Sequence, residues 1–156
     1  MRIGPILLAS TLLLAGCSDA TGPTDNQLLG MFELTAVDGD DLPVLIFDEF
    51  INDPQGGFTL RIELLDGTIE FYGTNQYEQV VDRRAFANDE LLPLGRFIDR
   101  GTWVRGNGNE IILESTLFEN LTTTATRDGG VIILEQDLSG ETRTGGKQPH
   151  RFEEID

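Results

Sequence analysis

The sequence predicts an all-β domain in which an antiparallel meander closes into a small barrel of about eight to ten strands. Apolar and polar residues alternate with period 2 in nearly every window after Leu28. The apolar runs are short and recur at intervals of roughly 8 to 14 residues, which is typical of all-β domains. Turn-forming pairs such as Asp38-Gly39 and Asp66-Gly67 separate them. A two-sheet β-sandwich is the alternative architecture.

The elements follow from these runs in order. Tight hairpins make neighbouring strands antiparallel, and closure of the sheet removes its exposed edges. Gly106-Asn107-Gly108-Asn109 and Asp128-Gly129-Gly130 predict further turns. One helical turn is expected over 82–92, ended by Pro93, and a polar loop over 139–148. The expected strands are 30–37, 44–50, 59–65, 68–74, 77–82, 96–105, 110–118, 121–127, 131–138 and 150–155.

The first 16 residues have the pattern of a signal peptide. Arg2 precedes an apolar stretch of about 14 residues, whereas a membrane-spanning helix needs about 20. The stretch ends in Leu14-Ala15-Gly16-Cys17, which resembles the lipobox of bacterial lipoproteins. The resemblance implies that residues 1–16 are removed. It also implies that Cys17, the only cysteine, becomes the first residue and carries palmitate-like acyl chains.

The lipoprotein resemblance also defines the mature chain and its location. The mature chain has 140 residues, with 10 basic side chains against 27 acidic ones, a net charge of −17. Two or three acyl chains hold a protein in a membrane far better than one, so the chain is anchored to the membrane without spanning it. Residues 17–27 form a flexible tether, and 28–156 form a single barrel domain. In Gram-negative families Ser18 favours the outer membrane of the cell envelope over the inner one.

A second resemblance concerns the folded domain. The pattern Gly30-x-Phe32-x-Leu34-x-x-Val37-Asp38-Gly39-x-x-Leu42-Pro43 is similar to the opening of small lipocalin-like β-barrel lipoproteins of uncharacterised function. Gly101-Thr102-Trp103-Val104, followed by Gly106-Asn107, is similar to a later strand and turn of the same proteins. The two patterns together match about a dozen positions, which are turn and core positions. The resemblance therefore implies a fold and carries no chemistry.

Composition excludes several classes of protein. The formal charge of −16 argues against nucleic-acid binding and against attachment to anionic headgroups, because both need a basic face. One cysteine excludes an internal disulfide and a cysteine-based zinc site. Asp38, Asp40 and Glu49 have EF-hand spacing, but Leu42 and Pro43 occupy positions that need an oxygen ligand and glycine. A solvated acidic edge is the expected role of Asp38, Asp40, Asp41, Asp48, Glu49 and Asp53, with a weaker cation site as the alternative.

The sequence marks no catalytic residue, metal site or cofactor site, so we expect a protein that is not an enzyme. His150 is the lone histidine, and we expect it at the surface or at a strand end. Glycoside hydrolysis would need two carboxylates at a set separation, and nothing marks such a pair. None of the four serines lies in a Gly-x-Ser-x-Gly elbow; they are Ser10, Ser18, Ser115 and Ser139.

Basic and aromatic residues each allow two interpretations. Five of the eleven basic residues fall between positions 83 and 105, where they either balance neighbouring acids or form an anion-binding strip. They are Arg83, Arg84, Arg96, Arg100 and Arg105.

The aromatic residues are expected in the core, with a ligand-binding barrel mouth as the alternative. They are Phe71, Tyr72, Phe97 and Trp103.

Two functions remain open on the sequence. The first is a non-catalytic, membrane-anchored barrel that binds a small apolar ligand or serves a structural role. The second is an acidic interaction or inhibitor protein that binds another envelope protein or a basic target; some bacterial lipoprotein barrels inhibit the basic enzyme lysozyme. The interior discriminates between them, because a ligand carrier needs a cavity of roughly 300 Å³ or more. A filled interior is favoured by the large residues Leu60, Ile62, Leu64, Ile69, Phe71, Ile111 and Leu113.

Overall fold

The computed structural model describes residues 28–54, 56–93, 95–118, 122–136 and 147–155. The expected signal peptide, Cys17 and tether lie outside the described residues, as does most of the expected loop over 139–148. Eleven strands form in the described part of the chain. They are β1 (Gly30–Val37), β2 (Asp40–Asp41), β3 (Val44–Ile51), β4 (Phe58–Tyr72), β5 (Gln76–Ala87), β6 (Glu90–Leu92), β7 (Phe97–Arg105), β8 (Glu110–Ser115), β9 (Thr122–Asp128), β10 (Val131–Gln136) and β11 (Gln148–Glu154).

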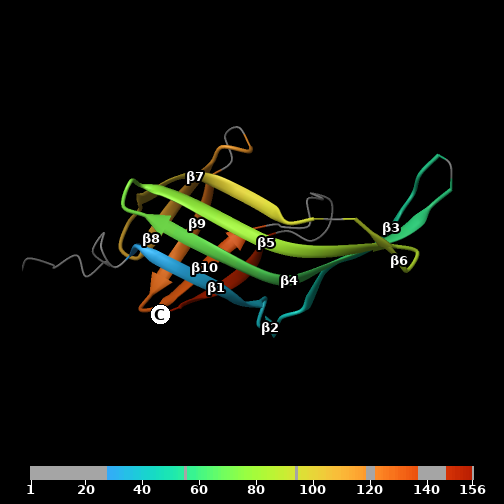
Figure 1. Ribbon diagram of the computed structural model, residues 1–156, viewed down its shortest axis with the longest axis horizontal. Helices are drawn as coiled ribbons and strands as arrows, with labels where there is room; N and C mark the ends of the chain where they lie inside the picture. The colour runs from blue at the N-terminus through green and yellow to red at the C-terminus, as the bar shows by residue number, and fades with distance from the viewer. Residues whose placement is uncertain (1–27, 55, 94, 119–121, 137–146, 156) are drawn as a thin grey trace, which may run out of the picture.

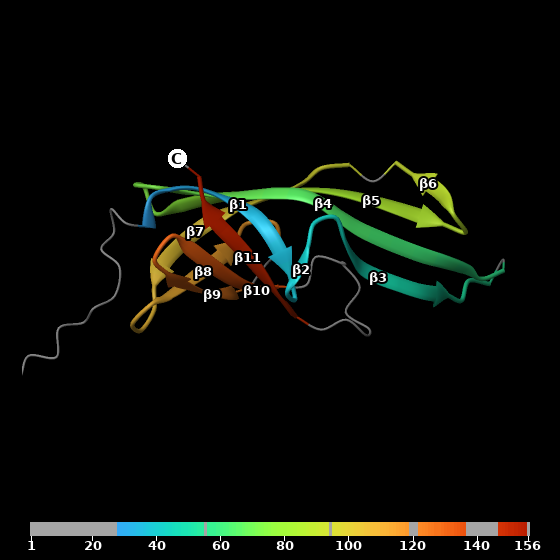
Figure 2. The ribbon, with the colours of Figure 1, turned by 90° about the horizontal axis from the view of Figure 1, so that it is seen from below.

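Eight of these strands close into an antiparallel barrel, which confirms the predicted fold class. The neighbours run β1-β11-β10-β9-β8-β7-β5-β4, and β1 also pairs with β4, so the sheet returns to its first strand. Figures 1 and 2 show β1 lying between β4 and the β10–β11 hairpin. An up-and-down barrel of eight strands agrees with the expected lipocalin-like architecture.

The predicted hairpin turns hold at three places. Asp38 and Gly39 both have positive φ angles, of 51° and 89°, and join β1 to β2. This left-handed geometry is the one that two-residue hairpins require. Residues 106–109 join β7 to β8, and Gly129-Gly130 joins β9 to β10.

The hairpin predicted at Asp66-Gly67 is wrong. β4 continues through these residues as one strand of 15 residues, with a bulge between Leu64 and Asp66. Gly67 is needed there for space, because an added Cβ would lie 3.2 Å from the carbonyl oxygen of Val80 and 3.3 Å from Leu34. The Asp-Gly pair therefore marks a bend with a close approach of neighbouring strands, which is another common role of glycine in a strand.

At this bend β4 exchanges one neighbour for another. Before the bulge β4 pairs with β3, and after it β4 pairs with β1. β5 changes its neighbour at the same level: it pairs with β7 as far as Val81, and with β6 from Ala85 onward. We call the part outside the barrel the wing: β3, residues 58–64 of β4, residues 83–87 of β5, and β6. Figures 1 and 2 show the wing extending away from the barrel.

The helical turn expected over 82–92 is also wrong, because this stretch is the outer hairpin of the wing. β5 runs to Ala87, and β6 begins at Glu90. Asn88 and Asp89 between them have φ angles of 48° and 67°, again the geometry of a two-residue hairpin. Side chains that fit a helical period also fit a strand here, and pairing with β4 favours the strand.

Apolar side chains line most of the barrel interior. Phe71 makes edge-to-face contacts with Phe32 and Trp103, each with ring centroids 6.0 Å apart and planes at 83°. Most of the predicted core residues are buried, whereas Leu60 and Phe97 are partly buried and Tyr72 is 37% exposed. The apolar cluster continues from the barrel onto the wing, where its members are Ile46, Phe47, Ile62, Leu64 and Ala85. Its other members are Leu28, Phe32, Leu34, Val37, Ile69, Phe71, Tyr77, Val81, Trp103, Ile111, Leu113, Ala125, Ile132, Leu134 and Phe152.

Candidate functional site

A polar cluster lies inside the barrel wall where β5, β7 and β8 meet. The hydroxyl of Tyr77 donates a 2.8 Å hydrogen bond to Oδ2 of Asp99, and the hydroxyl of Ser115 donates a 2.6 Å bond to Oδ1. Burial raises the pKa of Tyr77, and the bond to Asp99 raises it further. Tyr77 thus stays protonated and keeps its bond to Asp99. The two hydrogen bonds to Asp99 tie β5, β7 and β8 together.

Gly101 allows the same three strands to approach closely. A Cβ at this position would overlap the carbonyl oxygen of Glu114 and lie 2.8 Å from the ring of Tyr77. Tyr77 pairs directly with Gly101 across β5 and β7, so its ring covers the space that the missing side chain leaves. The glycine of the Gly-Thr-Trp motif therefore has a packing role, as the resemblance implied.

The prediction that His150 lies at the surface or at a strand end is wrong. His150 is completely buried within β11, opposite Val37 on one side and Leu134 on the other. Its Nδ1 lies 2.9 Å from the carbonyl oxygen of Gln148. Period 2 alone would have placed it inside, because Phe152 on the same face is a core residue.

Two buried glutamines line the barrel walls with an unused donor each. Gln79 on β5 is 2% exposed and Gln136 on β10 is 9% exposed. The amide Nε2 of neither residue has a hydrogen-bond partner in the described structure. A buried donor without a partner costs roughly 1 to 3 kcal/mol, so such atoms are normally satisfied by water or by a ligand. From the sequence, these two donors could be placed only in alternating strands.

Arg127 is a buried cation that joins β9 to β11. Its Nη2 lies 3.1 Å from Oε2 of Glu154, and its Nε donates a 2.6 Å bond to the carbonyl oxygen of Gly129. The guanidinium carbon lies 4.9 Å from the centroid of Phe32. Burial lowers the pKa of Arg127, whereas Glu154 raises it. The residue thus links the turn after β9 to the final strand.

Three of the five basic residues of 83–105 form ion pairs with acids, which favours charge balance over an anion-binding strip. Arg96 makes two bonds of 3.0 and 3.1 Å to Asp82, and it lowers the pKa of that carboxyl. Arg84 is paired with Glu63, and Arg100 with Glu78. Arg83 lies 5.0 Å over the ring of Phe97.

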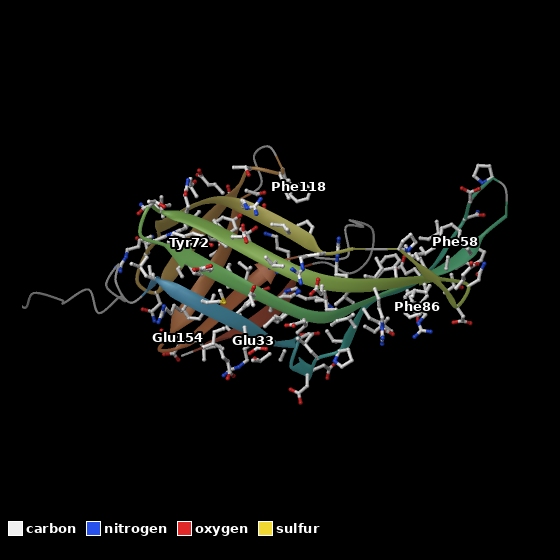
Figure 3. All side chains as sticks on the ribbon, viewed as in Figure 1. Glu33, Phe58, Tyr72, Phe86, Phe118 and Glu154 are labelled. Atoms are coloured by element: carbon white, nitrogen blue, oxygen red, sulfur yellow. The ribbon has the colours of Figure 1, made fainter. Side chains whose placement is uncertain are left out.

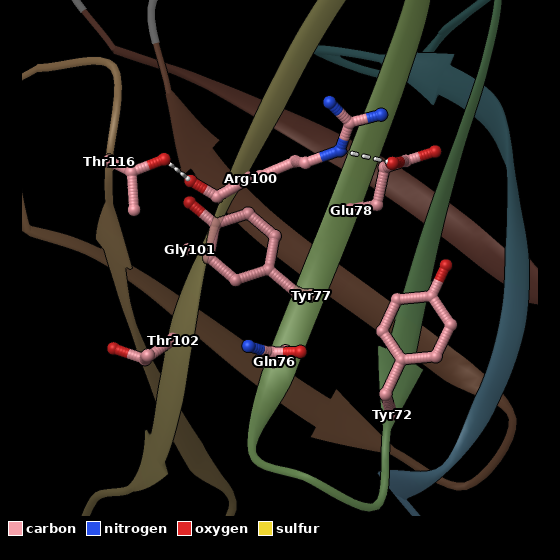
Figure 4. A pocket seen from close by; sticks show the side chains of 8 residues that line it. All are labelled: Tyr72, Gln76, Tyr77, Glu78, Arg100, Gly101, Thr102 and Thr116. Atoms are coloured by element: carbon pink, nitrogen blue, oxygen red, sulfur yellow. Dashed lines mark hydrogen bonds and ion pairs between the residues drawn. The ribbon is translucent and has the colours of Figure 1, made fainter.

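A shallow groove of about 280 Å³ lies on the outer surface of β5 and β7. Figure 4 shows its side chains, with the Arg100–Glu78 ion pair bridging the two strands. Tyr72 borders the groove and donates a 2.7 Å bond to Glu70, which raises the pKa of Tyr72 to about 12. Tyr72 is therefore a surface residue, whereas Phe71 and Trp103 lie in the core as predicted. The lining residues are Tyr72, Gln76, Tyr77, Glu78, Arg100, Gly101, Thr102 and Thr116.

The expected acidic edge is present. Asp40 and Asp41 are exposed on β2, and Asp48 is exposed on β3. In the part of the chain that the structure describes, no group of three His, Cys, Asp or Glu residues is placed to hold a metal ion. The acidic side chains thus form a solvated negative surface running from the barrel onto the wing.

The wing carries a cluster of charges around one aromatic ring. The guanidinium carbons of Arg61 and Arg84 lie 5.6 and 5.7 Å from the centroid of Phe86. Arg61 also contacts Glu63 and Asp89, each at 3.3 Å. Figure 3 shows Phe58 and Phe86 on the wing, with Tyr72 at the other end of the molecule.

Large apolar side chains are exposed on the same wing. Phe50 is 66% exposed, Leu91 is 63% exposed and Leu45 is 45% exposed. These residues lie in alternating runs, which are typical of strands that bury one face in a barrel. Alternation therefore did not reveal that these side chains are exposed. They mark the wing as a candidate binding surface, since exposed apolar groups are common where proteins meet partners.

Comparison with models of protein families, with curated proteins and with solved structures finds no match to this chain. No helix in the described residues is long and apolar enough to cross a membrane. The fold itself defines the class: a closed eight-stranded antiparallel barrel with a protruding β wing.

Proposed function

We propose that the chain is a lipid-anchored, non-catalytic protein of the bacterial cell envelope that binds another protein through its wing. The observation that carries this proposal is the contrast between the two parts of the fold. The barrel interior is occupied by aromatic and aliphatic side chains, whereas Phe50 and Leu91 on the wing face solvent. A surface of this kind supports protein binding more than transport of a ligand inside the barrel.

The charge of the chain supports a basic partner. A formal charge of −16 creates a negative potential that speeds encounter with positively charged proteins. Asp40, Asp41 and Asp48 place part of this charge at or beside the wing. A basic target such as lysozyme therefore belongs to the proposed class of partner.

Lipid attachment at Cys17 forms the second part of the proposal. The expected anchor would hold the domain near a membrane, with Ser18 favouring the outer membrane. Labelling with radioactive palmitate is expected to mark the native chain and to leave Cys17→Ser unmarked and outside the membrane fraction. Equal labelling or equal fractionation of the two proteins would refute the anchor.

Photo-cross-linking in cells tests the binding surface. A photoreactive phenylalanine analogue at Phe50 is expected to form one reproducible adduct with a partner protein. The matched control is the same analogue at Val104, which is 45% exposed on the outside of β7 in the barrel. Equal adducts at both positions, or adducts at neither, would contradict binding through the wing.

A second candidate function is a carrier of a small amphipathic ligand. The unpartnered amide donors of Gln79 and Gln136 favour it, because lipid carriers commonly use a few inward polar groups to orient a ligand. Such a ligand would lie among the apolar core side chains beside these two donors. A reproducible small molecule bound to protein isolated from its own membrane would favour this second candidate.

A further inference from the structure

We propose that the outer edge of β3 binds an extended segment of a partner protein by strand addition, and that this segment places a basic residue between two apolar ones on one face. This inference rests on the proposed function, since it specifies how the wing would bind a protein. Strand addition uses backbone hydrogen bonds for affinity and alternate side chains for specificity.

β3 has an unpaired edge among the described residues. It is the last strand of the sheet order and pairs with β4 alone. Figure 2 shows β3 at the border of the wing, with β4 beside it on one side. With eight residues and no Lys or Pro, β3 lacks two devices by which proteins usually block an exposed edge.

Backbone direction identifies the groups that face this edge. The amide of Asn88 donates to the carbonyl oxygen of Thr59, so Thr59 directs its backbone groups toward β5. Backbone groups alternate sides along a strand, and Leu60 therefore faces β3. Leu60 pairs with Glu49, so Glu49 directs its own amide and carbonyl back toward β4.

By the same alternation, the residues on either side of Glu49 face outward. Asp48 and Phe50 present their N–H and C=O groups to the unpaired edge. Leu45 lies beyond the bulge near Ile46. Like Asp48 and Phe50, it pairs with an odd-numbered residue of β4, and the odd-numbered residues there share one face. The side chains of Leu45, Asp48 and Phe50 therefore also share one face, in the order apolar, acidic, apolar.

Exposure shows that these side chains are accessible. Phe50 is two-thirds exposed, Leu45 is nearly half exposed, and Asp48 is exposed. Arg61 lies opposite Asp48 on β4, but it contacts Glu63 and Asp89. A strand added outside β3 would bring its own side chains about 5 Å from these three.

The charge of Asp48 indicates which kind of segment fits the β3 edge. A lysine or arginine facing Asp48 forms an opposite-charge pair across strands, whereas an acid there would repel it. Two copies of this chain pairing through β3 would oppose acidic edges on molecules that each carry a charge of −16. The edge therefore fits a basic and apolar segment of a different protein better than a second copy.

The test uses purified protein and an end-blocked heptapeptide, Thr-Val-Thr-Lys-Thr-Val-Thr, followed by NMR with amide exchange. The peptide is expected to slow exchange of the Asp48 and Phe50 amides. The same peptide with glutamate in place of lysine is expected to bind about tenfold more weakly. Protection elsewhere, no protection up to millimolar peptide, or equal affinity for both peptides would overturn the proposal.

Two variants separate the backbone from the side chain. Asp48→Pro removes an outward N–H, which an edge strand tolerates, and should weaken peptide binding about tenfold or more. Asp48→Ala keeps the N–H and should weaken binding only about threefold. Asp128→Ala, an exposed acid on β9, should leave affinity unchanged. Equal affinity of Asp48→Pro and the native chain would rule out strand addition.

The outcomes also distinguish this inference from the proposed function. Cross-linking at Phe50 without protection of the β3 amides would leave the wing as a binding surface but reject strand addition. Concentration-dependent protection of the same amides without peptide, together with a dimer in sedimentation, would show that a second copy occupies the edge instead. Failure of both cross-linking and protection would reject both proposals.

Discussion

The Tyr77 hydroxyl lies 2.8 Å from the Asp99 carboxylate inside the barrel wall, where it donates a hydrogen bond from β5 to β7. Tyr77→Phe would leave this buried acid with the Ser115 hydroxyl as its side-chain donor. Hydrogen bonds to buried charged groups contribute about 2 kcal/mol, so urea unfolding should show a loss of about that size. Tyr72→Phe, which removes an exposed bond, should cost about 0.5 kcal/mol or less.

Both tyrosines are expected to ionise late in alkaline titration. The pKa of Tyr72 is raised from 10.0 to about 12 by its bond to Glu70, and burial raises the pKa of Tyr77. Tyrosinate absorbance should therefore remain low at pH 10, where an unfolded chain is half ionised. Half ionisation of either tyrosine near pH 10 in the folded protein would contradict the described hydrogen bonds.

The same shifts set the sign of the stability change at high pH. The folded state holds the tyrosine protons more tightly than the unfolded state, so this contribution is fully present below about pH 10. It is lost as pH rises from about 10 through the raised pKa of the folded chain. Urea unfolding at several pH values should show the free energy of unfolding falling across this range, and Tyr72→Phe should reduce the slope.

Gly101→Ala should destabilise the barrel strongly. Its Cβ would overlap the backbone of Glu114, which side-chain motion cannot relieve. Overpacking of this kind costs about 3 kcal/mol, measurable by urea unfolding. The control is Gly95→Ala, where nothing lies within 4 Å of the added Cβ. A similar effect at both positions would mean that the close contact between β7 and β8 is absent.

Arg127 and Glu154 should respond unequally to substitution. Glu154→Gln leaves a buried cation without its carboxylate and should cost about 2 kcal/mol. Arg127→Met keeps apolar contact with Phe32 and leaves a half-exposed carboxylate, so it should cost about 1 kcal/mol. Thermal unfolding of the two variants checks the order. A more harmful Arg127→Met would show that the charge is needed for more than this ion pair.

Much of the barrel could be predicted from local pattern. Alternation located most strands, and pairs such as Asp38-Gly39 located turns that have the expected positive φ angles. Asp66-Gly67 misled the prediction because the same residue pair serves either a two-residue turn or a bulge. Which one forms depends on Leu34 and Val80, which are distant in sequence and approach Gly67 only in the folded barrel.

The candidate binding surface was less predictable than the fold. Alternation in β3 and β4 is the same whether a strand lies inside the barrel or on the wing, so Phe50 could not be identified as exposed. Ion pairing of Arg96 with Asp82 likewise depends on the register of β5 against the chain that follows it. Burial of His150, by contrast, could have been predicted from alternation with Phe152 on the same strand.

Native mass spectrometry of the protein isolated from its own membrane distinguishes a chain that acts through its outer surface from one that holds a ligand in the barrel. For action through the outer surface, we expect a protein mass with no non-covalently bound small molecule. A reproducible additional mass, released on unfolding, would show instead that the barrel carries a ligand.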